Sequence, residues 1–259
     1  MDHDAVRALS RGLDVLDALE TGDGMLLRDL HRSTTLPKPT LLRLLATLER
    51  RGYVTQRLAD GRWRRTLRGR SPPPSEPKER LLDCSKPVLR DLCRDVAWPS
   101  DVAVYREGTM EIIDTTRDLS PLAIDPVPVG LRVSLLTSGL GRAWLAYSSE
   151  TEREQAIAKA CLQPEVIQLT AEKQNAIAAA LARTRRNGYG RRSRVGTMKP
   201  SRQGDIGIAV PIVSADHLLG CINIVWRSAA MDEAMFVRRY LPRLRAAADT
   251  IGARASSSN

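Results

Sequence analysis

Basic side chains are concentrated in one stretch of this 259-residue sequence. Residues 28–70 contain 12 Lys/Arg and 3 Asp/Glu, a net charge of +9, whereas residues 1–27 carry −4 and residues 71–259 carry +5. Guanidinium and ammonium groups donate hydrogen bonds to phosphate oxygens and to guanine edges. The stretch therefore predicts a polyanionic partner, and nucleic acid is favoured over a membrane surface because the segment is not one long amphipathic helix. The alternative is a solvated basic face.

The residue types needed for catalysis or metal binding are scarce. The three histidines, His3, His31 and His217, lie far apart, and no Ser-His-Asp set or metal-ligand spacing accompanies them. The four cysteines form no CxxC pair, which argues against a zinc site and a disulfide framework. The glycines of 139–141 and 188–190 lack the strand-to-helix context of a nucleotide fingerprint. We therefore expect no enzyme, no metal and no cofactor.

The basic stretch lies among three predicted helices. Apolar residues recur at three- and four-residue steps from Val6 to Leu19, which predicts an amphipathic helix. Residues 25–32 predict a shorter helix, and residues 36–51 predict a third that Gly52 ends. Extended runs at 53–58 and 62–66 flank an Asp-Gly pair, a strong hairpin signal. Three helices followed by a hairpin predict a winged helix-turn-helix over residues 1–68.

The third helix is the candidate recognition helix, which would present its N-terminal residues to base edges. Proline is tolerated only in the first turn of a helix, so Pro37 and Pro39 mark its start. Lys38 precedes a proline, and we expect it at the cap. Leucines at 41, 44, 45 and 48 share one face, which we expect to be buried. The residues that point elsewhere, and are candidates for the major groove, are Lys38, Thr40, Leu42, Arg43 and Thr47.

The hairpin adds three arginines, Arg57, Arg62 and Arg64, which would lie along an adjacent DNA backbone or minor groove. Each assignment has a structural alternative. Arg43 is equally consistent with an internal salt bridge, and Leu42 with a core position. We expect Trp63 to pack against the third helix rather than stack on a base.

The remainder predicts a linker and a second domain. Residues 68–78 contain four prolines, and we assign residues 69–82 to a Pro-rich linker and residues 83–259 to an α+β domain around an antiparallel sheet. In that domain, helices are expected at 79–96, with Pro87 as a kink or interruption, and at 140–147, 152–162, 171–187 and 232–254; strands are expected at 101–106, 110–116, 205–213 and 218–226, with 189–195 as strand or loop.

The sequence has no feature of membrane insertion or export. The N-terminus lacks a basic start followed by a continuous apolar core, and no later run approaches the roughly 18 apolar residues of a membrane span. We expect a soluble cytoplasmic protein that does not contact membranes.

Several segments together match a known family. RALSRGLDVLDAL, LPKPTLLRLLATLERRGYV and DGRWRRT in the first half, and GLGRAWLA, GYG and IAVPIV in the second, resemble the IclR family of bacterial transcriptional regulators over essentially the full length. DVAWPSDVAV, SGLGRAWLAY and IAVPIVSADHLLGCINIVW look most like the subgroup containing the activator of hydroxyphenylpropionate catabolism.

The resemblance implies a winged helix, a linker helix and a GAF-like effector domain that binds a small organic acid. It also implies homodimers or homotetramers on double-stranded operators, with RNA polymerase as a further partner. Family pocket positions fall on Leu122, Val133, Gly139, Gly207, Asn223 and Val225. Two of them depart from the family pattern: Gly207 stands where many members have Cys or Ser, and Asn223 where many have Ser. The prolines at 72–74 interrupt the region where the family's linker helix begins.

Two functions remain in competition. The first is a ligand-responsive transcriptional regulator of an operon, for catabolism of aromatic or other small carboxylic acids. The alternative is a constitutive DNA-binding repressor or architectural protein without an effector. For an aromatic acid, Trp144 and Trp226 could supply stacking surfaces, although core packing is the default for Trp144.

Overall fold

The computed structural model describes residues 6–20, 24–66, 77–122, 124–163, 171–192, 204–215 and 217–256. The chain divides into two compact units, residues 1–83 and 84–259, and the division falls within helix α4 (Pro77–Val96). The proline run at 72–74 lies outside the described residues.

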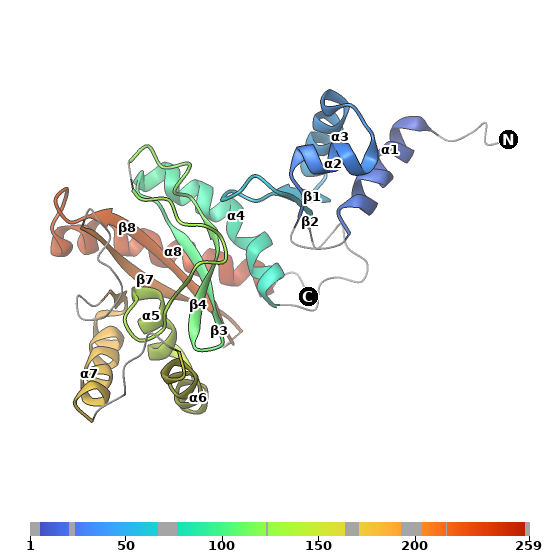
Figure 1. The fold of residues 1–259 in the computed structure, drawn as a ribbon. Coiled ribbons are helices and arrows are strands. Elements are labelled where there is room, and N and C mark those ends of the chain that lie inside the picture. The colour runs from blue at the N-terminus through green and yellow to red at the C-terminus, as the bar shows by residue number, and fades with distance from the viewer. Residues whose placement is uncertain are drawn as a thin grey trace. The chain divides into compact units, whose positions relative to one another are not determined.

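Besides the start of α4, the described residues of the first unit form three helices and a two-stranded antiparallel sheet (Figure 1). The elements are α1 (Arg7–Ala18), α2 (Leu27–Thr34), α3 (Lys38–Arg50), β1 (Val54–Gln56) and β2 (Trp63–Arg65). One apolar cluster joins them, formed by Val15, Leu19, Leu30, Leu36, Leu41, Leu45, Val54 and Trp63. Trp63 therefore packs in the core, as expected, and the helix-turn-helix prediction is confirmed.

Three local expectations need correction. Met25 does not begin α2; its backbone N–H and C=O each pair with Trp63 at 2.8 Å, so Met25 extends the wing sheet instead. Lys38 is the first helical residue rather than the cap, which is Pro37. Leu44 and Leu48 are only partly buried, whereas Leu41 and Leu45 are fully enclosed.

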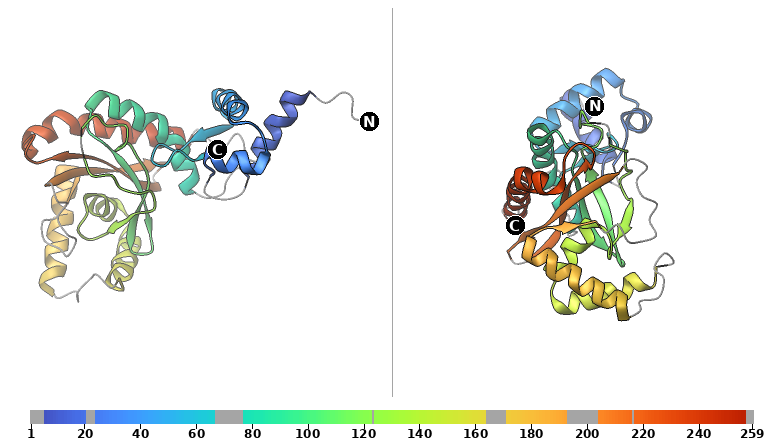
Figure 2. Two further views of the ribbon diagram at one scale, coloured as in Figure 1. Left: turned by 45° about the horizontal axis from the view of Figure 1, so that its top comes forward. Right: turned by 90° about the vertical axis from the view of Figure 1, so that its left-hand side faces the viewer.

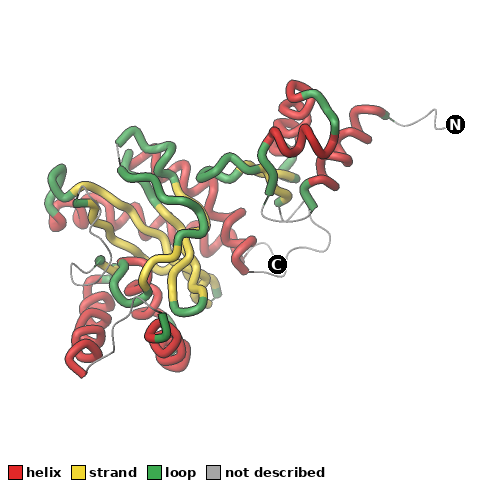
Figure 3. The backbone as a smooth tube through the Cα atoms, viewed as in Figure 1, coloured by secondary structure: helices red, strands yellow, loops and turns green. Residues whose placement is uncertain are grey.

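In the described part of the second unit, six strands form a sheet in the order β5-β4-β3-β8-β7-β6 (Figures 1 and 3). All neighbouring strands are antiparallel. The strands are β3 (Asp101–Arg106), β4 (Thr109–Thr115), β5 (Arg132–Ser134), β6 (Gly190–Arg191), β7 (Asp205–Ser214) and β8 (His217–Arg227). The predicted α+β class with an antiparallel sheet is confirmed.

Helices cover both faces of this sheet (Figure 2). On one face lie α5 (Gly139–Tyr147), α6 (Glu150–Cys161) and α7 (Ala171–Asn187). On the other lies α8 (Glu233–Ser256), whose Phe236 stacks on Trp226 of β8 with ring centroids 3.7 Å apart. Because side chains alternate along a strand, Trp226 faces α8, while Asn223 and Val225 face α5.

The α5 face depends on close backbone contacts. A Cβ on Gly190 would lie 2.2 Å from the carbonyl oxygen of Gly139, and a Cβ on Gly141 would lie 2.1 Å from that of Leu135. Gly190 therefore lets β6 pack directly against α5, and Gly141 lets α5 pack directly against Leu135, which precedes the helix.

Other expected elements match closely. Helix α4 continues through Pro87 rather than ending there. Helix α6 begins two residues earlier than expected, at Glu150, because Ser149 and Glu152 form a capping box. The segment at 189–195, expected as strand or loop, contributes only Gly190–Arg191 as a strand, and residues 193–195 lie outside the described part of the chain.

Candidate functional site

The first candidate surface is the solvent-facing side of α3. Lys38, Leu42, Arg43 and Thr47 are exposed there, and Thr40 is half-buried. The hydroxyl of Thr47 donates to the carbonyl oxygen of Arg43 at 2.9 Å. Leu42 is 49% exposed, so it is not a core residue. Arg43 forms no ion pair with any residue that the structure describes, so the internal salt bridge weighed above is not formed within those residues.

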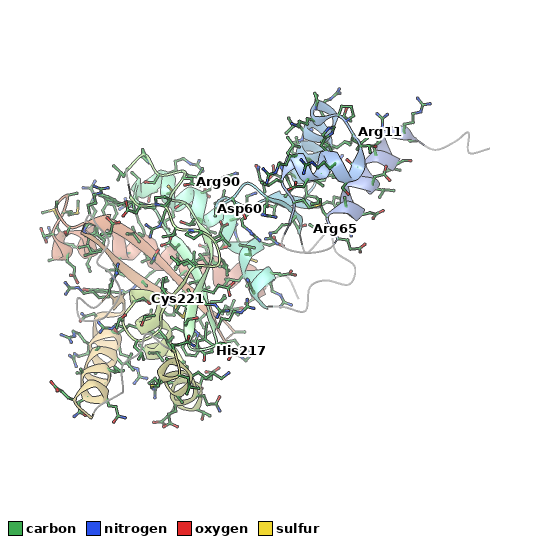
Figure 4. The ribbon with its side chains drawn as sticks, viewed as in Figure 1. Arg11, Asp60, Arg65, Arg90, His217 and Cys221 are labelled. Carbon is green, nitrogen blue, oxygen red and sulfur yellow. The ribbon has the colours of Figure 1, made fainter. Side chains whose placement is uncertain are left out.

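The wing arginines differ from one another. Arg57 pairs with Asp60, labelled in Figure 4, at 3.0 Å. Arg62 donates to the carbonyl oxygen of Gly24 at 3.0 Å and keeps a side chain that is 41% exposed. Arg64 is 6% exposed and forms an ion pair with Asp83 of α4. Arg64 is thus buried in an ion pair within its own unit and is not available for contact with DNA.

The second candidate site is a cavity of about 240 Å³ on the α5 face of the sheet. It lies between α5, strands β7 and β8, and the segments around β5. Five of the six positions derived from the family resemblance line it, namely Val133, Gly139, Gly207, Asn223 and Val225. Leu122 does not line it; its backbone pairs with the hydroxyl of Ser120 in the loop after β4. Gly207 and Val225 are direct partners across β7 and β8.

A buried ionic network forms part of the cavity wall. Arg117 donates to both carboxylate oxygens of Asp101, from Nε at 3.1 Å and from Nη2 at 2.9 Å. Asn223 accepts from the backbone N–H of Asp101 at 2.7 Å and donates to its Oδ2 at 3.0 Å. Thr115 adds a hydrogen bond of 2.6 Å. Burial tends to raise the pKa of Asp101, but the charge and hydrogen bonds of these partners lower it overall.

The pKa of a second carboxylate in the wall, Asp205, is shifted in the opposite direction. Burial and the nearby charge of Asp125 raise the pKa of Asp205, and the cations Arg117 and Arg192 only partly offset this. Charges of both signs therefore line the cavity, which can accept polar groups as well as apolar ones.

The start of α5 supplies hydrogen-bond donors at the cavity. Thr137, Ser138, Gly139 and Leu140 are consecutive lining residues. Ser138 is the N-cap, and its hydroxyl accepts from the N–H of Gly141 at 2.9 Å. The first N–H groups of a helix have no acceptor inside it and carry partial positive charge, so they favour an anion.

Among the residues that the structure describes, no aromatic side chain lines this wall. Trp144 stacks on Tyr105 with centroids 4.4 Å apart, and Trp226 stacks on Phe236 on the other face of the sheet. Neither is a lining residue. The interpretation of either tryptophan as a ligand-stacking surface was therefore wrong, because partners within the fold already cover their rings. The lining around Ile112 and Val127 is aliphatic instead.

Several lining residues were missed in the sequence. Ser138 directly before an apolar helix is an N-cap signal that could have identified the donor end of the cavity. Asp101 and Arg117 could not have been found in this way, because their pairing is a tertiary contact. The further partner of Asp101, Asn223, is 122 residues from it. Among the described residues, no cluster of three or more potential metal ligands occurs, and no helix is both long and apolar enough to span a bilayer. Cys221 is buried in the sheet, and His217 begins β8 (Figure 4).

Comparison with known proteins agrees with this architecture. Residues 8–58 match the IclR helix-turn-helix domain, and residues 78–253 match the C-terminal domain of the bacterial transcriptional regulator IclR. The chain is 30% identical over 151 residues to the transcriptional repressor IclR of Escherichia coli, an alignment covering 57% of this chain and 55% of that protein. The chain therefore matches only about half the length of this curated relative.

Solved structures share the fold along nearly the whole chain. The Thermotoga maritima IclR structure has a TM-score of 0.56 at 16% identity and covers 97% of this chain and 100% of its own. An IclR homologue from Microbacterium hydrocarbonoxydans, crystallised as a complex with 4-hydroxybenzoate, has a TM-score of 0.53 at 21% identity and covers 96% of this chain and 99% of its own. Two family domains in sequence order, matched over most of the chain, place this protein in the IclR family of bacterial transcriptional regulators.

Proposed function

We propose that this protein is a ligand-responsive, DNA-binding transcriptional regulator. The observation that carries the proposal is the exposed face of α3, which presents Lys38, Leu42, Arg43 and Thr47 to solvent while Leu41 and Leu45 anchor the opposite face. A helix held in this way can enter the major groove, with Lys38 and Arg43 on phosphates or guanine edges and Leu42 on a thymine methyl. Arg62 of the wing would contact the adjacent backbone.

The proposed effector is a small organic acid bound in the cavity of the second unit. Its carboxylate would lie at the start of α5, against Thr137 and the first backbone N–H groups, and its body against aliphatic side chains such as Val133 and Val225. A volume of about 240 Å³ favours a compact ligand. The homologue crystallised with 4-hydroxybenzoate, and the sequence likeness to the hydroxyphenylpropionate subgroup, make aromatic acids the first class to test.

We further propose that the protein acts as a homodimer or homotetramer on an operator controlling genes for the catabolism of such an acid. An effector that binds two arrangements of the dimer unequally would shift their populations and change operator affinity or contact with RNA polymerase.

DNA recognition is tested by measuring specific binding to the DNA upstream of the protein's own gene and its neighbours, at physiological salt. Lys38→Ala and Arg43→Ala should each weaken specific binding by about 1–3 kcal/mol if they contact base edges. Arg11→Ala removes the same charge from α1 and is the matched control, for which only a small, sequence-independent loss is expected. Equal losses in all three variants would show that α3 does not read the sequence.

Effector binding is tested by thermal unfolding of the protein against aromatic and aliphatic carboxylic acids. A ligand that binds only the native state raises stability with concentration. Thr137→Val keeps the side-chain shape but removes a donor to a carboxylate, so it should weaken binding by about 1.5–3 kcal/mol. Thr250→Val, on the exposed side of α8, should leave affinity unchanged. A protein that binds its operator but none of the acids would be the effector-free DNA binder.

A further inference from the structure

A second cavity, of about 280 Å³, lies in the same unit beside α5 and α7. The charged side chains that line it are mostly cationic. Arg142 of α5, Arg183 of α7, Arg191 of β6 and the following Arg192 contribute guanidinium groups, whereas Glu233 is the single carboxylate among the lining residues. Thr184, Asn187 and Tyr189 add polar groups.

Glu233 offsets only part of this charge. It pairs with Arg191 at 2.7 Å and accepts from the hydroxyl of Tyr189 at 3.4 Å. Burial lowers the pKa of Arg142, and the charges of Arg183 and Arg191 lower it further. The folded chain therefore holds like charges together at a cost, and an anion between them would relieve that cost.

One of these arginines, Arg142, is also held in position. Arg142 donates from Nε to the carbonyl oxygen of Leu136 and from Nη1 to that of Arg191, both at 3.2 Å. These bonds fix one guanidinium at the cavity before any ligand arrives. Guanidinium groups bind phosphate and carboxylate oxygens through paired N–H donors, so a cluster of them matches an anion with several oxygens.

This cavity is distinct from the effector cavity. Arg192 is the one lining residue that the two share. The effector cavity has mixed charges and an aliphatic wall, whereas the second cavity is cationic and polar. A single-carboxylate effector is therefore not the expected occupant of the second cavity.

We propose that the cavity lined by Arg142, Arg183, Arg191 and Arg192 is a second ligand site, which binds a small polyvalent anion bearing phosphate groups or several carboxylates. The bound anion bridges α5, α7 and β6, so it stabilises the α5 side of the unit. Because Arg192 also lines the effector cavity, a metabolite of this class is in a position to modulate effector binding.

The test is isothermal titration of the full chain with pyrophosphate and, separately, with a tricarboxylate, at constant ionic strength set by chloride. Arg183→Gln should weaken binding at least tenfold, since it removes one guanidinium from an exposed position on α7. Arg186→Gln is the matched control: it lies one turn along the same helix, is exposed and does not line the cavity. We expect its affinity to stay within twofold of the wild type.

The outcomes distinguish a phosphate ligand from a polycarboxylate ligand, and the arginine-lined cavity from the effector cavity. Binding of pyrophosphate alone identifies a phosphate-bearing ligand, and binding of the tricarboxylate alone identifies a polycarboxylate. Absence of binding by both anions, or equal affinities of the two variants, overturns the proposal. A loss caused by Thr137→Val as large as that caused by Arg183→Gln would place the anion in the effector cavity, which also overturns it. None of these results depends on DNA binding, so the proposed regulatory function is tested independently.

Discussion

Asp101 shows how much of the cavity on the α5 face of the sheet depends on single buried residues. Its carboxylate receives hydrogen bonds from Arg117, Thr115 and Asn223. Thr115 lies at the end of β4 and Arg117 just after it, and Asn223 lies on β8 more than 100 residues later. Asn223, one of the positions that depart from the family pattern, is therefore occupied with Asp101 rather than free to bind a ligand carboxylate. If the cavity binds an acid, as we propose, the polar contacts come from elsewhere in the wall, and the start of α5 offers donors.

Replacing Arg117 with Gln should destabilise the second unit by about 3–5 kcal/mol at neutral pH, because it leaves Asp101 buried without its ionic partner. The loss should depend on pH. The pKa of Asp101 is lowered in the folded protein, so its stabilising contribution is present above the usual carboxyl pKa and disappears as pH falls through the lowered value. Urea unfolding should show the largest difference between wild type and variant at neutral pH, and a smaller difference as the pH falls and Asp101 becomes protonated.

The control for this experiment is Arg132→Gln, at an exposed position on β5. Surface substitutions usually change stability by less than about 0.5 kcal/mol. A difference between wild type and Arg117→Gln that does not narrow in acid would show that Asp101 is not the group that Arg117 stabilises.

At the scale of elements, replacing a glycine with alanine should have opposite effects on stability in the two units. Gly190→Ala would place a Cβ 2.2 Å from the carbonyl oxygen of Gly139 and 2.6 Å from the N of Ala143, so α5 must move away from β6. We expect a loss of about 3 kcal/mol or more in the second unit, at or beyond the usual cost of overpacking. Gly12→Ala is the matched variant: a Cβ there meets nothing within 4 Å, and alanine favours α1 by up to about 1 kcal/mol.

Thermal unfolding, followed for each unit by hydrogen exchange, distinguishes these two effects. If Gly190→Ala leaves the exchange of α5 and β7 unchanged, the close contact between α5 and β6 does not limit stability. If Gly12→Ala is less stable than the wild type, the added methyl group must clash with atoms that do not lie near Gly12 in this structure.

Elements were more predictable than the site. Helix and strand periodicity located α1, α3, α5, α7, β3 and β7 within a few residues, because each buries one face over several turns or pleats. Met25 was wrongly assigned to a helix. Its bridge to Trp63 joins residues that are distant in sequence, and local periodicity does not reveal such a contact. The cavity positions that were found came from family likeness, whereas the Asp101–Arg117 pair and the arginine cavity arise only when separate elements pack together.

At the scale of the whole molecule, the first helix carries an apolar stripe that the described residues of its own unit leave exposed. Val6, Leu9 and Leu13 follow one another at three- and four-residue steps along α1 and are 66%, 62% and 51% exposed, although the amphipathic pattern of that helix is typical of a buried face. Exposed apolar patches of this kind commonly mark contacts with another protein. A homodimer, as proposed above, would bury this stripe against a second copy of the chain.

Changing Leu9 and Leu13 together to Glu should raise the dimer dissociation constant by at least about 100-fold, since each buried leucine contributes about 1.5–3 kcal/mol and a buried carboxylate adds a further cost. Sedimentation velocity measures this directly, with Leu119→Glu, at a 47% exposed position in the second unit, as the control. A dimer reads two half-sites about 34 Å apart. Operator affinity should therefore fall when the dimer is lost. A variant that stays dimeric would place the interface elsewhere; one that becomes monomeric yet binds the operator normally would show that a single subunit suffices for recognition.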